Sequence, residues 1–146
     1  MTLKIKTTND INSPIFKDAL NIRLSVFVDE QGVPEELERD DFDVITDHLV
    51  GYQGDQPVTT IRIKAEADQW HIQRVATVKT ARGHGYAKQL IEYSIQSAIA
   101  EPKIIKLVLG AQLTAIPFYE KLGFKVIGPE FLDAGILHRE MELKVK

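Results

Sequence analysis

The sequence predicts a single α/β domain in which a mixed β-sheet is covered by helices on both faces. Three observations lead to this prediction. The 146 residues are enough for one domain with its own core. A hydrophobic fraction of 44% and a charged fraction of 27% are ordinary for a globular protein. Strand-like and helix-like segments follow each other in the order β–α–βββ–α–β–α–ββ, with no internal repeat or linker.

The N-terminal part is predicted to form a strand and then a long helix. Residues 3–7 alternate apolar and polar side chains, as a half-buried strand does. Asn12 or Ser13 can cap the helix that follows. Pro14 suits the first helical position, because that residue needs no N–H donor. The apolar residues then keep a helical spacing until Gly32 ends the segment.

The rest of the chain contains the remaining strands and two more helices. Acidic residues gather in residues 28–43, which we expect to be a solvated loop with at most a short helical turn. Residues 47–78 contain two hairpin connections and therefore predict three consecutive antiparallel strands. Apolar spacing predicts a helix from Tyr86 to near Pro102. A strand over 103–111, a short helix over 114–123, and two strands over 124–131 and 136–145 complete the chain.

Composition excludes several classes of function. The chain has no cysteine, which rules out disulfides, thiolate catalysis by the protein and Cys-ligated zinc, and we expect no metal site. A net charge of −3 gives no support for nucleic-acid binding, which needs a basic face. No apolar run approaches the roughly 18 residues of a membrane span, and residues 1–10 lack the apolar core of a signal peptide. We therefore expect a cytoplasmic protein without membrane contact.

The most informative stretch is Arg82-Gly83-His84-Gly85, which separates a strand-like run from a helix. Such a turn presents unpaired backbone N–H groups and the positive end of a helix dipole, which together attract phosphate. The ATP-binding loop G-x-x-x-x-G-K-[ST] is excluded, since Tyr86 and Ala87 follow Gly85. The dinucleotide loop G-x-G-x-x-G fits poorly, because Lys88 stands at its last glycine and three antiparallel strands precede the turn.

A third phosphate loop, R/Q-x-x-G-x-G/A, fits from Arg82 to Ala87. With this motif the chain resembles the GNAT superfamily of N-acetyltransferases. Ala115 to Phe124 is similar to the signature A-x-x-F-Y-x-x-x-G-F of that family. Residues 23–43 with His48, and residues 131–141, resemble a small bacterial branch with ElaA-like and YjcF-like members. The resemblance implies one GNAT domain over 1–146, with a mostly antiparallel sheet, a splayed parallel strand pair and acetyl-CoA as donor.

The resemblance also implies roles for the residues around the glycine turn. The strand Val75-Ala76-Thr77 would pair with the pantetheine arm, and the turn would hold the pyrophosphate. Tyr119 would protonate the departing thiolate as a catalytic acid; the alternative is that its ring only packs beside Phe118 and Phe124. The implied coenzyme A contacts are Val75, Ala76, Thr77, Arg82, Gly83, His84, Gly85, Tyr86, Ala87 and Lys88.

The acceptor side is less well determined. An amine with a pKa near 10 must lose a proton before it attacks the thioester, yet Gln73 stands where some relatives carry a glutamate, and it cannot take a proton. The candidate bases are His48, His71, Glu35, Glu36 and His138, or a water chain. Residues expected to meet the acceptor are Arg23, Glu36, His48, Arg74, Gln112 and His138. Arg23 and Arg74 fit equally well as ion-pair partners of the acidic segment.

We expect the acceptor to be a small-molecule primary amine such as an amino acid, an amino sugar or a polyamine. Two alternatives stay open: acetylation of a peptide or protein amine, and a non-catalytic acyl-CoA-binding module, which the absence of a clear carboxylate base would suit. A further departure from the branch is Gly110, where several relatives carry Asn; its missing side chain is expected either to widen the site or to leave the Gln112 amide to supply polarity. Relatives are often dimers, so a homodimer is one option for the oligomeric state.

Overall fold

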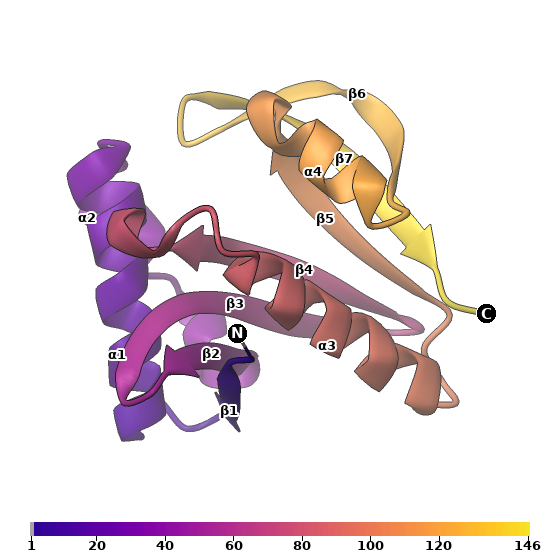
Figure 1. The fold of residues 1–146 in the computed structure, drawn as a ribbon. Helices are drawn as coiled ribbons and strands as arrows, with labels where there is room; N and C mark the ends of the chain where they lie inside the picture. Colours follow the sequence, from indigo (N-terminus) through magenta and orange to yellow (C-terminus); the bar gives the residue numbers. More distant parts are fainter. Residues whose placement is uncertain (1) are drawn as a thin grey trace.

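A computed structural model describes residues 2–146, which form one seven-stranded sheet with the strand order β1-β2-β3-β4-β5-β7-β6 (Figure 1). Neighbouring strands are antiparallel except β4 and β5, which run parallel. In chain order the elements are β1 (Lys4–Thr8), α1 (Pro14–Arg23), the π-helical η1 (Leu24–Glu30), α2 (Glu35–Glu38), η2 (Asp41–Ile45), β2 (Asp47–Gln53), β3 (Gln56–Glu66), β4 (Gln69–Thr77), η3 (Lys79–Ala81), α3 (Tyr86–Ala100), β5 (Lys106–Gln112), η4 (Leu113–Ala115), α4 (Ile116–Lys121), β6 (Lys125–Asp133) and β7 (Ile136–Lys144).

Helices cover both faces of the sheet, as the sequence predicted. Adjacent residues of a strand point to opposite faces. On β2, Leu49 belongs to the core that contains Leu90 of α3, whereas Val50 packs in a separate core with Ala19 of α1. The sheet is therefore sandwiched between an α1 face and an α3 face. None of the helices among residues 2–146 has both the length and the apolar character needed to span a lipid bilayer.

The first helix starts and ends for local reasons. Ser13 is the N-cap, and its hydroxyl accepts a hydrogen bond from the Ile15 N–H at 3.1 Å. Pro14 takes the first helical position. The helix continues directly into η1, which stops before Gly32, a residue with a φ of 73°. As a result, one long helical segment carries the N-terminal part of the chain to the edge of β4.

The parallel strands β4 and β5 separate half-way along their length. Residues 69–72 pair with residues 106–109, and β4 has no pairing with β5 beyond Ile72. The second half of β5 remains paired with β7. A bulge interrupts β4 at the point of separation, where Arg74 adopts a φ of 54°. The backbone edge of residues 73–77 is thus left open toward β5, as the resemblance implied.

The acidic segment 28–43 differs from the expected solvated loop. Glu38 and Asp43 are buried, because the equally buried guanidinium of Arg23 lies between them. Arg23 Nε is 2.6 Å from a Glu38 carboxylate oxygen, and its Nη1 is 2.9 Å from Asp43. Arg62, on β3, extends the network with a second contact of 2.9 Å to Asp43. Such buried charges are stable only when each has a partner, so this network fixes α2 and η2 against the sheet.

Candidate functional site

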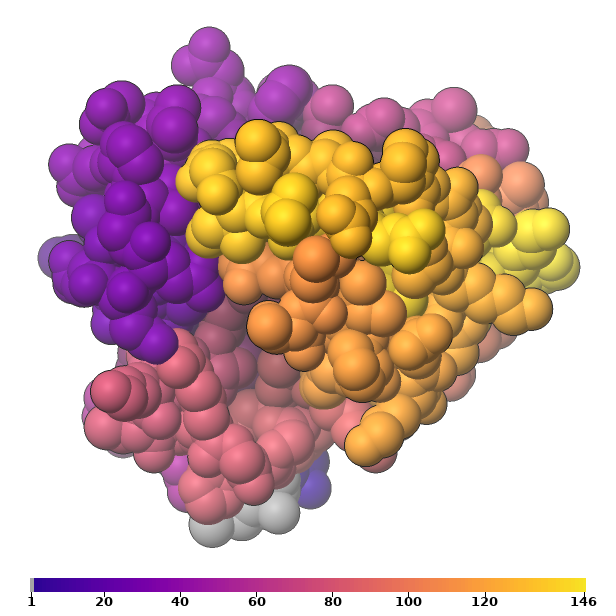
Figure 2. Space-filling view, turned by 90° about the horizontal axis from the view of Figure 1, so that it is seen from above, coloured from indigo at the N-terminus to yellow at the C-terminus, as the bar shows by residue number. Residues whose placement is uncertain are grey.

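A cavity of about 730 Å³ opens where β4 and β5 separate. Figure 2 looks into its mouth, a hollow bounded by the N-terminal segment in purple, the residues around the glycine turn in pink and the C-terminal part in orange and yellow. Its lining includes the predicted residues Arg74, Val75, Ala76, Thr77, Arg82, Gly83, Tyr86, Ala87, Lys88, Gln112, Tyr119 and His138, and also His71. The structure therefore brings together most of the residues that the sequence singled out.

This cavity reaches both faces of the sheet. Gln112 of β5 is in register with His138 of β7, which is in register with Phe131 of β6, so these three side chains share one face. The Gln112 amide contacts Gln31 at 3.1 Å, which identifies this as the face next to η1. Tyr119 belongs to the core on the α3 face. A group passing between the two strands would meet Tyr119 on one side of the sheet and His138 on the other.

The glycine turn has the shape of a phosphate cradle. Gly83 and Gly85 have φ values of 85° and 75°, a region that glycine enters without strain, and a side chain at either position would meet no atom within 4 Å. The turn thus has open space in front of its backbone. Because α3 begins at Tyr86, the free N–H groups of its first turn lie at the same place. These features fit the pyrophosphate of coenzyme A.

Two side chains of the turn have defined partners. Arg82 is held in a bidentate ion pair, with its Nη atoms 2.7 and 2.6 Å from the two carboxylate oxygens of Glu30, while its Nε donates to the Thr77 carbonyl at 3.0 Å. The His84 ring stacks on Tyr86 at 5.4 Å and does not line the cavity. Glu30 is a partner that sequence reasoning missed, because it lies 52 residues before Arg82 and no local pattern joins them.

Tyr119 lies in α4 with its ring edge-on to Phe118 and Phe124, at centroid distances of 5.0 and 5.9 Å. Burial raises the pKa of its phenol, so the hydroxyl remains protonated at neutral pH. Nothing among residues 2–146 hydrogen-bonds this hydroxyl, which keeps some exposure to the cavity. The ring is therefore a packing residue whose hydroxyl is free to serve a ligand.

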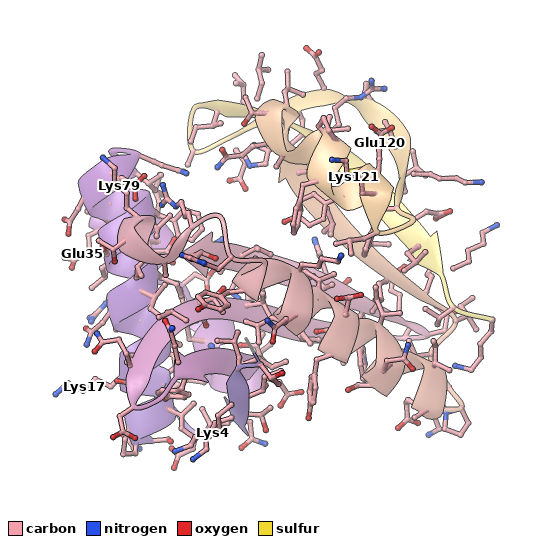
Figure 3. The ribbon with its side chains drawn as sticks, viewed as in Figure 1. Lys4, Lys17, Glu35, Lys79, Glu120 and Lys121 are labelled. Atoms are coloured by element: carbon pink, nitrogen blue, oxygen red, sulfur yellow. The ribbon has the colours of Figure 1, made fainter. Side chains whose placement is uncertain are left out.

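Of the five candidate bases, the structure brings only His71 and His138 to the cavity lining. Glu35 and Glu36 are exposed on α2 and lie outside that lining; Glu35 is on the outer side of the helix in Figure 3. His48 is 1% exposed, and its Nε2 lies 3.0 Å from the Asp43 carbonyl oxygen. Burial lowers the pKa of the His48 imidazole. The expectation that His48 meets the acceptor is therefore corrected, since it packs beneath η2.

The two arginines expected at the acceptor have different positions. Arg23 is 1% exposed, and its guanidinium N–H groups donate to Glu38 and Asp43. It therefore cannot reach an acceptor and is instead an ion-pair partner of the acidic segment. Arg74 does line the cavity, but its Nη2 already donates to the Leu37 carbonyl, the Glu38 carbonyl and Asp40. The Arg23 guanidinium is thus fully committed to holding the chain, and the Arg74 guanidinium is held through Nη2.

Gly110 and Gln73 are also explained by the structure. A side chain at Gly110 would begin 3.1 Å from Cζ of Phe131, so the expected extra space is filled by this ring. Gln73 accepts hydrogen bonds from Nε and Nη2 of Arg62 at 2.9 and 2.6 Å. Gln73 is therefore part of the buried charge network, and Phe131 is a lining residue that the sequence did not indicate.

The comparisons with known proteins agree with this geometry. Residues 15–145 match the family model described as an acetyltransferase (GNAT) domain. The chain belongs to the GNAT family. It is similar to the uncharacterized N-acetyltransferase YjcF of Bacillus subtilis, with 37% identity over 131 residues that cover 89% of this chain and 93% of YjcF. An acyl-CoA N-acyltransferase structure from Pseudomonas aeruginosa is 27% identical, covers 97% of this chain and 99% of its own, and gives a TM-score of 0.83.

Escherichia coli ElaA shares the fold. It is 24% identical, the match covers 97% of this chain and 99% of the ElaA chain, and the TM-score is 0.83. The predicted family, its small bacterial branch and the fold are thereby confirmed. As a GNAT protein the chain is an acyltransferase, and its donor is acetyl-CoA.

Proposed function

We propose that this GNAT protein transfers the acetyl group of acetyl-CoA to the primary amine of a small molecule. The observation that carries the proposal is the cavity, which joins the glycine turn and Tyr119 on the α3 face to a space on the α1 face. When bound, acetyl-CoA supplies a thioester whose carbonyl carbon an amine nitrogen can attack. Residues 82–88 would hold its pyrophosphate, and the open edge of residues 75–77 would pair with its pantetheine arm.

The residues around the sheet opening would assist the transfer in two ways. Backbone N–H groups of residues 75–77 can polarise the thioester carbonyl as an oxyanion hole does. The Tyr119 hydroxyl, protonated at neutral pH because burial raises the pKa of the phenol, would give its proton to the departing sulfur. It is suited to this because no protein group among residues 2–146 occupies it.

The part of the cavity on the α1 face is here called the acceptor half, and the part next to the glycine turn the donor half. The walls of the acceptor half favour a small acceptor over a peptide. Leu37 and Glu38 of α2 line one side, while Asp133 and Ala134 at the β6–β7 turn line another. The Gln31–Gln112 contact bridges the N-terminal segment and β5 across the site. In Figure 2 the hollow lies between the N-terminal segment, the residues around the glycine turn and the C-terminal part of the chain.

An amine panel tests the proposal directly. The purified protein should bind acetyl-CoA in isothermal titration at tens of micromolar or better, and should release coenzyme A thiol with at least one amino acid, amino sugar or polyamine. Turnover with peptides alone would favour the peptide alternative instead. Binding of acetyl-CoA without thiol release across both panels would favour the non-catalytic acyl-CoA-binding module.

A further inference from the structure

We propose that His138 is the general base of the transfer, accepting the amine proton on Nε2; this inference rests on the proposed function. His138 lies on β7, in register with Gln112 of β5 and Phe131 of β6. It lines the cavity on the α1 face, opposite the face that carries Tyr119. An imidazole there would meet an amine that approaches the thioester from the acceptor half.

The hydrogen bonding of His138 fixes which ring nitrogen can act. Its Nδ1 lies 2.7 Å from the Ile136 carbonyl oxygen. A carbonyl oxygen only accepts hydrogen bonds, so Nδ1 must carry the hydrogen. The neutral ring then keeps its lone pair on Nε2. This atom has no hydrogen-bond partner among residues 2–146 and is not fully buried, so it is open to the cavity that the residue lines.

Packing also holds the ring in one orientation. Phe131 stacks on the imidazole at a centroid distance of 5.7 Å and an angle of 25°. The residue as a whole is only 9% exposed. The Ile136 carbonyl fixes the Nδ1 edge of the imidazole, and Phe131 covers one face of the ring. The Nε2 lone pair therefore has a defined direction before any ligand binds. This is the arrangement expected of a base that must be positioned as well as deprotonated.

Two other titratable groups that line the cavity, Glu38 and His71, have charged partners of their own. Glu38 has one carboxylate oxygen 2.6 Å from Arg23 Nε and the other 3.1 Å from Arg74 Nε. His71 lies in the paired part of β4, with Nδ1 3.6 Å from Glu66. The charged or titratable side chains that can influence His138 are Glu38 of α2, His71 and Arg74 of β4, Asp133 of β6 and Glu140, which shares its face of β7.

The proton balance of the step is complete without a further co-reactant. A neutral amine nitrogen forms a bond to the carbonyl carbon, and the carbon–sulfur bond breaks. His138 Nε2 takes the proton that the nitrogen loses, while the Tyr119 hydroxyl supplies the proton that the sulfur gains. Solvent then removes the proton from His138 and returns one to Tyr119. The amide and the free thiol are the products.

A His138→Asn variant tests this role, because the Asn amide can still donate to the Ile136 carbonyl while the Nε2 position is lost. With any amine that the wild-type protein acetylates, we expect kcat to fall about 10²- to 10³-fold, within the usual range for loss of a general base. Acetyl-CoA affinity should remain unchanged in isothermal titration. Any rise of kcat/KM with pH in the wild-type protein should also disappear. Leu137→Asn is the matched control, since Leu137 is exposed and lies outside the cavity lining.

Two further measurements keep the inference separate from the proposed function. In long-range ¹H–¹⁵N spectra of the labelled protein at pH 8, His138 should carry its hydrogen on Nδ1; a hydrogen on Nε2 would overturn the assignment. Loss of the pH-dependent rise in His71→Asn, with His138→Asn unaffected, would transfer the role to His71. A wild-type enzyme that turns over an amine while His138→Asn does so equally well rejects the base alone. A wild-type protein that acetylates no amine rejects the proposed function, and the base with it.

Discussion

Replacing Tyr119 by Phe removes one hydroxyl and leaves the aromatic packing in place. The ring contacts Phe118 and Phe124 through its edges, which the substitution preserves. No group among residues 2–146 hydrogen-bonds the hydroxyl, so its removal leaves no buried polar group without a hydrogen bond. We therefore expect the free energy of unfolding to change by no more than about 0.5 kcal/mol. Any loss of activity would then be chemical in origin.

The expected loss follows from the proposed role of the phenol as a proton donor. Burial raises the pKa of Tyr119 and keeps the donor protonated, so the wild-type enzyme can supply a proton as the sulfur departs. Loss of general-acid catalysis typically costs 10²- to 10⁴-fold, and a thiolate is a good leaving group, so we place the effect near the lower limit. A loss of about 10²-fold corresponds to about 2.7 kcal/mol of transition-state stabilisation. Acetyl-CoA affinity should not change.

The absence of cysteine from the chain makes the assay simple. A thiol-reactive dye reads only the coenzyme A that is released, because the protein contributes no thiol of its own. Steady-state rates of wild-type and Tyr119→Phe, with acetyl-CoA binding measured by titration and stability by thermal unfolding, separate the three effects. A kcat within twofold of wild type, or a weakening of acetyl-CoA binding that matches the loss of rate, would refute the acid role and leave Tyr119 as a packing residue.

Three further predictions concern other parts of the molecule. Glu30→Gln removes the partner of Arg82 and a negative charge beside the glycine turn. Acetyl-CoA should therefore bind about threefold more tightly at low salt, and this gain in affinity should shrink as the salt concentration rises. Weaker acetyl-CoA binding in titration would mean that Glu30 instead positions Arg82. Gly110→Ala places a methyl group 3.1 Å from Phe131 and must displace that ring. The acceptor KM should therefore rise by about three- to tenfold while acetyl-CoA affinity stays constant. An unchanged acceptor KM in steady-state kinetics would contradict a role for Phe131 in the acceptor pocket. Burial lowers the pKa of His48, so the unfolded chain takes up a proton first as the pH falls below about 6.5, and thermal stability should decline from pH 7 toward pH 5. The decline should be smaller in His48→Gln, and an equal slope in both proteins would speak against this linkage.

Local rules were enough to predict the features that depend on neighbouring residues. Ser13 caps the first helix through its own hydroxyl, and α3 begins at Tyr86 directly after the glycine turn. Gly83 and Gly85 were predicted to allow a close approach of a phosphate group, and their positive φ values and open surroundings fit that interpretation. In each case the residue and the atoms that decide its conformation lie within a few positions of each other.

The features that the sequence did not predict depend on partners far along the chain. Arg23 is buried by carboxylates 15 and 20 residues later, and nothing near Arg23 distinguishes it from an arginine that faces a substrate. The missing side chain at Gly110 was expected to widen the site, whereas Phe131 of a strand that is not its neighbour fills the space. Burial and register across the sheet decide both cases, and neither follows from local spacing.

The left-handed conformation of Arg74 has a consequence for how this site can change. Its guanidinium hydrogen-bonds to α2 while its backbone forms the bulge that opens β4, so the α2 wall of the cavity is tied to the strand that we propose binds the donor. A substitution that reshapes this wall to admit a different amine would therefore disturb the grip on acetyl-CoA. On the opposite wall, residues 132–135 around the β6–β7 turn are exposed and are not part of the Phe131–His138 stack. New acceptor preferences should arise most readily by substitution in that hairpin, with the donor half left intact.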